Sequence, residues 1–449
     1  MRRATTFAVD ASAVARATAR GPRANERRER GVGRGRGRFR ANEIDGIARA
    51  LMQRERVVVV VTAVVGVLAL STRHRCAVLR RIALLGKLTA RLARYGTSRW
   101  VVKLCGLVAY SIILAPAFLR VAWYYATSKN VKRGIAYGAN ARNTLDLYFP
   151  EDCAASSLDF NASTTKGTSG KQDDERRPVV IFITGGMWII GYKAWGALLA
   201  QRLARRGIIV ASLDYRNFPQ GTVGDMIADV SNGISWVLER LDALGGDKRK
   251  VVVVGQSAGA HLAATAIIRQ SEWVARSPNI WSPGSISKFI GISGVYAPDD
   301  AALIEHFHRQ GLYKNVFWSI MEAGFTGSRA AEALPRSSPV SMLREREVRD
   351  SVHILPPVML CHGEADASAP PEQSRAFATA LRAAGVKVDE KYYAGKTHTD
   401  PFVTDPILGR DILLDDIANS IFGKRVAPFD EKPLMPRVFV ALARKVVPF

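Results

Sequence analysis

The stretch VVVVGQSAGAHLA, residues 251–263, decides the fold. Its four valines are typical of a buried strand, and the alanine-rich run that begins at Ala258 is typical of a helix. Ser257 stands on the short connection between them, with Gly255 and Gly259 two positions away on either side. A serine on so tight a strand-to-helix turn indicates a nucleophile elbow, in which the backbone of the serine is strained. An ordinary glycine-containing turn is the alternative, so a base, an acid and an oxyanion hole must be found elsewhere.

Composition places most of the chain in the globular class. The 449 residues are 48% hydrophobic and 23% charged, which is enough to bury a large core. The net charge is +24, but residues 1–100 alone hold 23 Lys and Arg against 6 Asp and Glu. The basic character therefore belongs mainly to an N-terminal extension, and no specific nucleic-acid partner is expected. The four cysteines show no paired spacing, so neither a zinc site nor a disulfide framework is predicted.

The N-terminal extension divides into two predicted parts. Residues 1–47 are interpreted as a disordered basic tail, with an organelle transit peptide as the alternative. Residues 48–130 are predicted to be a membrane-associated helical region, because apolar runs at 57–70 and 104–119 flank a basic amphipathic helix at 77–96. Either run could instead be a core helix. Whether the runs span a bilayer or dip in and return is left open.

Residues 131–425 are predicted to form a catalytic domain, followed by a C-terminal extension at 426–449. A hairpin is predicted at its start, at 137–150, and strands then alternate with helical patterns, which favours a doubly wound, mainly parallel sheet. Helix-like pieces without a strand at 300–345 predict a helical cap over the sheet's C-terminal edge. The predicted strands after the hairpin are 178–184, 208–215, 250–255, 288–294, 357–363 and 388–395.

A base and an acid follow Ser257 in the order that an α/β-hydrolase needs, namely serine, acid, histidine. Asp366 comes just after the strand 357–363, and His398 just after the strand 388–395. Both are loop positions at strand ends, where catalytic residues of open sheets gather. Glu364 is the rival acid, and we prefer Asp366. We interpret the other histidines, including His261 and His362, as structural or remote.

The oxyanion hole requires backbone N–H groups that converge on the developing negative charge. Ala258, the residue after the nucleophile, is expected to supply one of them. The glycine pair after the strand 178–184, Gly185 and Gly186, is expected to supply the other, because glycine permits the close approach. The mechanism calls for no metal and no cofactor.

Longer motifs carry a family resemblance. The core resembles the α/β-hydrolase fold, in its hormone-sensitive-lipase-like or carboxylesterase branch, and most closely the plant isoprenylcysteine α-carbonyl methylesterases. The similarity runs from about Arg99 to Phe422. One departure is Thr184 at a position where many relatives in the wider branch have the histidine of His-Gly-Gly-Gly. The matching stretches are YGANARNTLDLYFP (137–150), TGGMWIIGYKAWG (184–196), LDYRNFPQGTVGDM (213–226), GQSAGAHLA (255–263) and GKTHTDPFVTDPILGRD (395–411).

This resemblance implies hydrolysis of the methyl ester of a C-terminal isoprenylcysteine by Ser257, Asp366 and His398. The implied partners are prenylated cysteine methyl esters or prenylated proteins together with membrane lipids. The implied location is the endoplasmic reticulum and Golgi membrane, with the domain facing the cytosol. Trp188, Tyr192 and Trp195 could line a prenyl groove or pack in the core. A generalist carboxylesterase, lipase or formamidase is the alternative, and a non-catalytic receptor on the same fold is a third possibility.

Overall fold

The computed structural model describes residues 98–153, 176–274, 281–428 and 431–446, all of which belong to one compact unit. The expected basic tail at 1–47, the apolar run at 57–70 and the amphipathic helix at 77–96 lie outside these residues.

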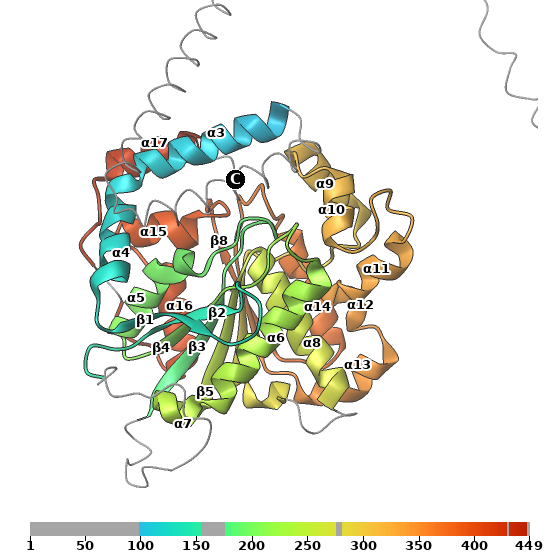
Figure 1. Ribbon diagram of the computed structural model, residues 1–449, viewed down its shortest axis with the longest axis horizontal. Coiled ribbons are helices and arrows are strands. Elements are labelled where there is room, and N and C mark those ends of the chain that lie inside the picture. The colour runs from blue at the N-terminus through green and yellow to red at the C-terminus, as the bar shows by residue number, and fades with distance from the viewer. Residues whose placement is uncertain (1–97, 154–175, 275–280, 429–430, 447–449) are drawn as a thin grey trace, which may run out of the picture. The chain divides into compact units, whose positions relative to one another are not determined.

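A single mixed sheet of eight strands organises the described residues, in the order β1-β2-β4-β3-β5-β6-β7-β8 (Figure 1). β2 runs antiparallel to both of its neighbours, and every pairing from β4 to β8 is parallel. The predicted mainly parallel sheet is therefore confirmed. The hairpin begins earlier than expected, because β1 precedes the quoted stretch. The strands are Val131–Ala136 (β1), Thr144–Tyr148 (β2), Arg177–Ile183 (β3), Ile209–Leu213 (β4), Gly246–Gln256 (β5), Lys288–Ile292 (β6), Val358–Gly363 (β7) and Val388–Tyr393 (β8).

Helices cover both faces of the sheet, and β3 shows how the sequence divides between them. Val179, Ile181 and Ile183 belong to one hydrophobic cluster, whereas Val180 and Phe182 belong to another. Successive side chains of a strand point to opposite faces, so a strand buried on both faces needs a continuous apolar run. The helices of the first face are Val223–Glu239 (α6), Ala258–Val274 (α8) and Glu372–Ala383 (α14), and those of the second are Ala197–Arg205 (α5) and Ile412–Phe422 (α16).

Short helices lie between β6 and β7, where the sequence predicted a cap. Their side chains extend the first hydrophobic cluster beyond the sheet. These helices are Ala301–Gln310 (α9), Lys314–Ile320 (α10), Ala330–Arg336 (α11), Pro339–Met342 (α12) and Arg346–Ser351 (α13). The remaining short helical elements are Lys193–Gly196 (η3), Leu241–Leu244 (α7), Pro283–Ser285 (η4), Val352–Ile354 (η5), Asp400–Thr404 (η6) and Asp405–Ile407 (α15).

Two helices precede the sheet, Ser98–Ile113 (α3) and Ala115–Thr127 (α4). They meet at an angle of 74°. Pro116 explains the bend, since it has no N–H to bond the carbonyl of Ile112 and its ring would collide with that turn. Among the described residues, neither helix alone has the length and apolar character of a membrane span, although the bent pair together does.

The helix pair packs on the catalytic fold. Tyr110, Leu114 and Ala117 are buried in a third cluster that includes Leu198 of α5. The C-terminal helix Arg437–Val446 (α17) lies beside α3 and adds Val440 to this cluster (Figure 1). The described part of the segment that the sequence predicted to be membrane-associated, residues 98–130, thus contributes buried side chains to the core.

Candidate active site

Ser257 lies on the turn between β5 and α8 with a backbone φ of 53°, a value that a serine rarely adopts. Steric limits explain the flanking glycines. A Cβ at Gly259 would come within 2.2 Å of the carbonyl oxygen of Ile183, and one at Gly255 within 2.5 Å of Ala260 Cα. The flanking glycines and the strained backbone of Ser257 therefore have one physical origin, a turn too tight for larger residues.

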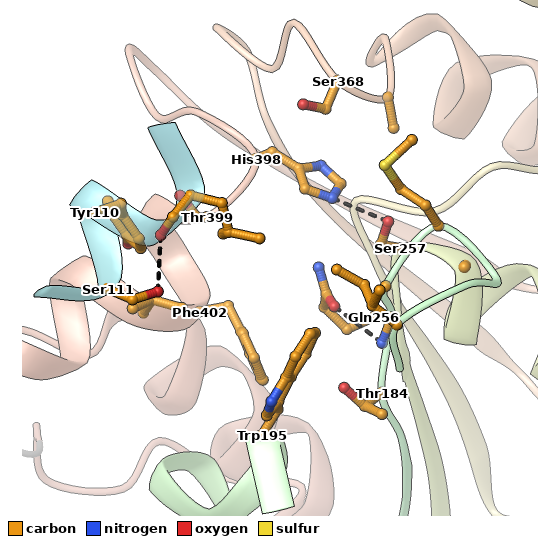
Figure 2. A pocket seen from close by; sticks show the side chains of 18 of the residues that line it. Tyr110, Ser111, Thr184, Trp195, Gln256, Ser257, Ser368, His398, Thr399 and Phe402 are labelled. Carbon is orange, nitrogen blue, oxygen red and sulfur yellow. Dashed lines mark hydrogen bonds between the residues drawn. The ribbon is translucent and has the colours of Figure 1, made fainter. Parts of the chain in front are cut away.

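The fold brings together the three residues that the sequence placed far apart. His398 Nε2 lies 2.9 Å from Ser257 Oγ, and His398 Nδ1 lies 2.7 Å from Asp366 Oδ2 (Figure 2). All three are buried, with 5–9% of each residue exposed. With the proton on Nδ1, His398 donates to the carboxylate and accepts from the serine hydroxyl. This arrangement suits a general base that activates a nucleophile.

Asp366 is held by more donors than His398 alone. Its Oδ1 accepts from the backbone N–H groups of Ser368 and Ala369, each at 2.9 Å. Burial by itself would raise the pKa of Asp366, but attraction to His398 when that ring is protonated and the hydrogen bonds from His362 and His398 outweigh it, so the pKa is lowered. Glu364, the rival acid, has a side chain 46% exposed that faces Arg375 instead. The carboxylate beside His398 is therefore that of Asp366.

His362 is the second histidine on this carboxylate, a contact that sequence reasoning missed. Its Nε2 lies 2.8 Å from the carbonyl oxygen of Ala369 and 3.1 Å from Asp366 Oδ2. Because a carbonyl oxygen only accepts, Nε2 carries the proton and donates. Nδ1 then accepts from the hydroxyl of Ser374, at 2.7 Å. His362 was interpreted as structural, and the structure shows that it contacts the carboxylate beside His398.

The loop after β3 turns sharply toward Ser257. Gly186, Met187 and Trp188 all have positive φ values, of 128°, 52° and 61°. The N–H of Gly185 donates to Gln256 Oε1 at 3.1 Å. This differs from the expectation that Gly185 donates to an oxyanion, since its N–H is already engaged. Within the described part of the chain no acceptor is found for the N–H groups of Gly186 and Ala258.

The three aromatic residues predicted for a substrate groove differ in their positions. Trp188 is 2% exposed, and its Nε1 donates to His261 Nδ1 at 3.1 Å. Trp195 is 48% exposed and lines the pocket beside Ser257, whereas Tyr192 is not among the pocket residues and its ring lies under the guanidinium of Arg142. Trp188 touches the pocket but mainly packs in the core. Of the two alternatives predicted for these residues, lining a groove therefore applies to Trp195 and core packing applies to Trp188.

The pocket has a volume of about 510 Å³. Most of its lining is apolar, and it reaches from Ser257 and His398 to the helices α3 and α4 (Figure 2). Phe307 and Leu312, in and just after α9, close it from the cap side. In the described ranges, no group of three or more His, Cys, Asp or Glu side chains could hold a metal ion.

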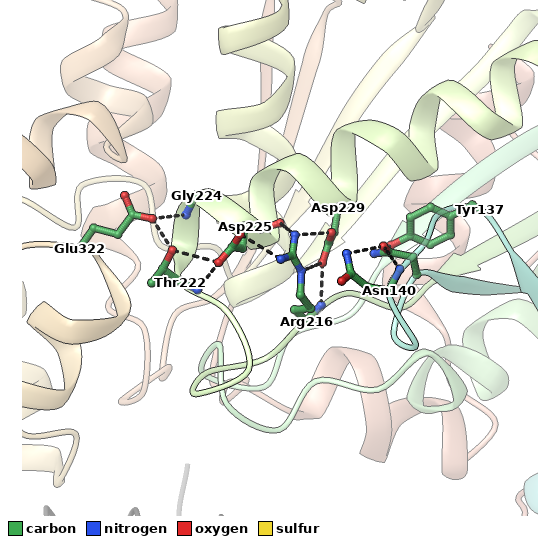
Figure 3. A network of polar contacts seen from close by, with 9 residues as sticks. Tyr137, Asn140, Arg216, Thr222, Gly224, Asp225, Asp229 and Glu322 are labelled. Atoms are coloured by element: carbon green, nitrogen blue, oxygen red, sulfur yellow. Dashed lines mark hydrogen bonds and ion pairs between the residues drawn. The ribbon is translucent and has the colours of Figure 1, made fainter.

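A polar network joins the cap to the core (Figure 3). Arg216, just after β4, forms paired hydrogen bonds of 2.8 Å with both carboxylate oxygens of Asp229 on α6. Thr222 and Asp225 close the first turn of α6 as a capping box. Glu322, beyond α10, accepts from Thr222 Oγ1 and from the N–H of Gly224. The cap segment is thereby tied to the N-terminus of α6.

Known proteins resemble the chain over most of its length. The isoprenylcysteine alpha-carbonyl methylesterase ICME of Arabidopsis thaliana is 42% identical over 374 residues, which is 81% of each chain. The chain belongs to the isoprenylcysteine α-carbonyl methylesterase family. A rice relative, "Probable isoprenylcysteine alpha-carbonyl methylesterase ICME" of Oryza sativa subsp. japonica, is 42% identical over 78% of this chain and 80% of its own.

Two further comparisons give partial matches. The BD-FAE family model matches residues 168–381. Among solved structures, the apo form of Thermogutta terrifontis esterase 2 is 23% identical with a TM-score of 0.45, covering 67% of this chain and 97% of that one. Membership of the methylesterase family and the mainly parallel sheet covered by helices on both faces make the chain an α/β-hydrolase and a carboxylic ester hydrolase. In this methylesterase-family chain, the pocket beside Ser257 is accordingly the site where an ester is expected to bind.

Proposed function

We propose that the chain hydrolyses the methyl ester of C-terminal isoprenylcysteine, giving the free carboxylate and methanol. The observation that carries the proposal is that Ser257 and His398, hydrogen-bonded to each other, open into an apolar pocket of about 510 Å³. A methyl ester of a prenylated cysteine has one small polar group to attack and one long apolar chain to bury. Such a pocket gains affinity mainly by removing that chain from water.

The proposed reaction proceeds through an acyl-enzyme. His398 takes the proton of Ser257 as Oγ bonds to the ester carbonyl carbon, and Asp366 stabilises the imidazolium that forms. The N–H groups of Gly186 and Ala258 are placed to donate to the oxyanion. His398 then protonates the departing methoxide, which leaves as methanol. Water, deprotonated by His398, attacks the acyl carbon and releases the carboxylate while Ser257 recovers its proton.

Methanol release from S-farnesylcysteine methyl ester tests this proposal. Wild type and Ser257→Ala are compared in detergent micelles, with a non-prenyl aliphatic methyl ester as a second substrate. We expect hydrolysis by wild type only, with strong preference for the prenyl ester. Equal cleavage of both esters would identify a generalist carboxylesterase. Full activity in the alanine variant would overturn the assignment of Ser257 as the nucleophile.

We also propose that the chain works at the membrane of the endoplasmic reticulum and Golgi. Support comes from the outward faces of the first two helices: Val102 and Ile112 of α3 and Leu119 and Trp123 of α4 are each 60–73% exposed. α3, α4 and α17 contain no acidic residue, whereas α17 ends with Arg444 and Lys445. Exposed apolar side chains beside basic ones suit the interface of a bilayer with anionic headgroups.

Fractionation and protease protection test this location. The full chain should co-sediment with endoplasmic reticulum and Golgi markers, and added protease should degrade its catalytic domain in sealed microsomes, because we propose that the domain faces the cytosol. Leu119→Glu combined with Trp123→Glu should weaken binding to vesicles of anionic phospholipid. Protection of the domain from protease would contradict the cytosolic orientation, and a wholly soluble chain would contradict membrane association.

A further inference from the structure

Helices α3 and α4 supply one wall of the pocket that contains Ser257. Leu107 and Tyr110 line it from α3, and Phe118, Val121 and Ala122 line it from α4. Ser257, Asp366 and His398 all lie in the part of the chain that begins at β1. The side chains of α3 and α4 therefore affect which substrate binds rather than the chemical step.

The opposite wall at this end of the pocket is also apolar. Phe402, which follows the His398 loop, stacks on Phe182 of β3 with ring centroids 5.6 Å apart. Trp195 and Leu198 of α5 also line the pocket. Figure 2 shows Tyr110, Phe402 and Trp195 around the end of the pocket away from the Ser257–His398 pair.

Packing holds the helical wall in place. Leu114, at the bend, is fully buried against the third cluster. Tyr125 near the end of α4 donates its hydroxyl to Asp146 Oδ2 at 2.8 Å, and Lys103 on α3 donates to Gln310 Oε1 of α9 at the same distance. The wall is therefore joined to both the sheet and the cap, as a preformed binding surface requires.

We propose that α3 and α4, together with Trp195 and Phe402, form the subsite for the apolar chain of the ester, and that Ala122 limits how long a chain can bind. The inference rests on the esterase function proposed for Ser257. The leaving methoxy group needs little room, so the volume of the pocket serves the acyl side. Each CH₂ of the chain buried here should raise kcat/KM by about fourfold until the subsite is full.

Two alanines of α4 offer a matched pair for a test. Both residues are exposed, but only Ala122 lines the pocket, whereas Ala126 lies one turn further along the same helix and outside the lining. Ala122→Phe adds a ring to the subsite, and Ala126→Phe adds the same ring one turn beyond the lining. Leu107→Trp, with its exposed neighbour Val108→Trp, forms a second pair on α3 in case the first variant does not fold.

The substrates are N-acetyl-S-alkylcysteine methyl esters with methyl, hexyl and dodecyl chains on sulfur, so that the reacting atoms stay constant. For wild type and Ala126→Phe, kcat/KM for methanol release should rise with chain length. Ala122→Phe should lower kcat/KM for the S-dodecyl ester about tenfold or more relative to the S-methyl ester, as expected from several CH₂ groups kept out of the subsite. An identical chain-length profile in Ala122→Phe and wild type would overturn the proposal.

p-Nitrophenyl acetate and decanoate separate this inference from the methylesterase proposal. If wild type ignores the cysteine esters but cleaves both p-nitrophenyl esters, the prenylcysteine function is wrong. The subsite then stands only if Ala122→Phe selectively loses the decanoate. If Ala122→Phe and Ala126→Phe lose the long ester equally, the effect does not come from the pocket and the subsite is wrong.

Discussion

At the first region the side chains of Ser257, His398 and Asp366 are joined by hydrogen bonds, whereas the wall built by α3 and α4 offers the pocket mainly apolar side chains. The first region lies at the ends of β5, β7 and β8, where the sheet fixes each loop. The second comes from helices outside the sheet that are held by packing. The difference indicates a division of labour, in which strand ends set the chemistry and the added helices set the ligand. Variants that lower kcat without changing the chain-length preference, and others that do the reverse, would support this division.

The largest effect is expected from Asp366→Asn, which disturbs only the first region. An amide at this position would donate to His398 Nδ1, so the imidazole would carry its proton on the nitrogen that should accept from Ser257. We expect kcat to fall by about 10⁴-fold, the scale known for this exchange in a serine protease triad. KM for a long-chain ester should stay near the wild-type value, because the wall is untouched. Steady-state kinetics measure both constants, and a large rise of KM would break the proposed separation.

Lys193→Met is expected to weaken the support of the second region. Lys193 Nζ pairs with Asp146 Oδ1 at 2.8 Å, and both side chains are almost completely buried. Asp146 also accepts from Tyr125 of α4, and Lys193 begins the short helix that carries Trp195. Removing the ammonium leaves a buried carboxylate without its counter-charge, which typically costs about 3–5 kcal/mol of the free energy of unfolding.

Urea unfolding measures this loss, and Lys248→Met provides the matched control. Lys248 pairs with Asp242 at 2.7 Å, but both side chains are more than half exposed. Such a pair usually contributes less than about 1 kcal/mol. Equal destabilisation by the two variants would show that burial of the Lys193–Asp146 pair is not what matters.

The same two regions show which features of the site could be predicted from the sequence and which could not. Ser257, Asp366 and His398 followed from chain order and from their places at strand ends, because a parallel sheet brings those ends to one edge. The hydrogen bond from Gly185 to Gln256 and the second histidine on Asp366 depend on side-chain directions that no periodicity encodes. The apolar run 104–119 could be read as membrane or core, since a helix can be apolar on a face turned to lipid and on a face turned to a pocket. Only tertiary packing shows which residues face inward.

The smallest effect is expected at His261, a buried histidine beside the catalytic region that stays neutral in the folded protein. Its Nδ1 accepts from Trp188, and its Nε2 lies 2.6 Å from the carbonyl oxygen of Ser337, so it is neutral. Burial lowers its pKa from 6.5 to about 4. The unfolded chain therefore binds a proton that the folded chain refuses. This contribution to stability is fully present above pH 6.5 and disappears as the pH falls toward 4, which amounts to about 3 kcal/mol.

His261→Gln keeps one acceptor and one donor but cannot titrate. Between pH 7 and pH 4, urea unfolding should show wild type losing about 3 kcal/mol more than this variant. Parallel pH profiles would mean that His261 is protonated in the fold, and that its bond to Trp188 is not the one described.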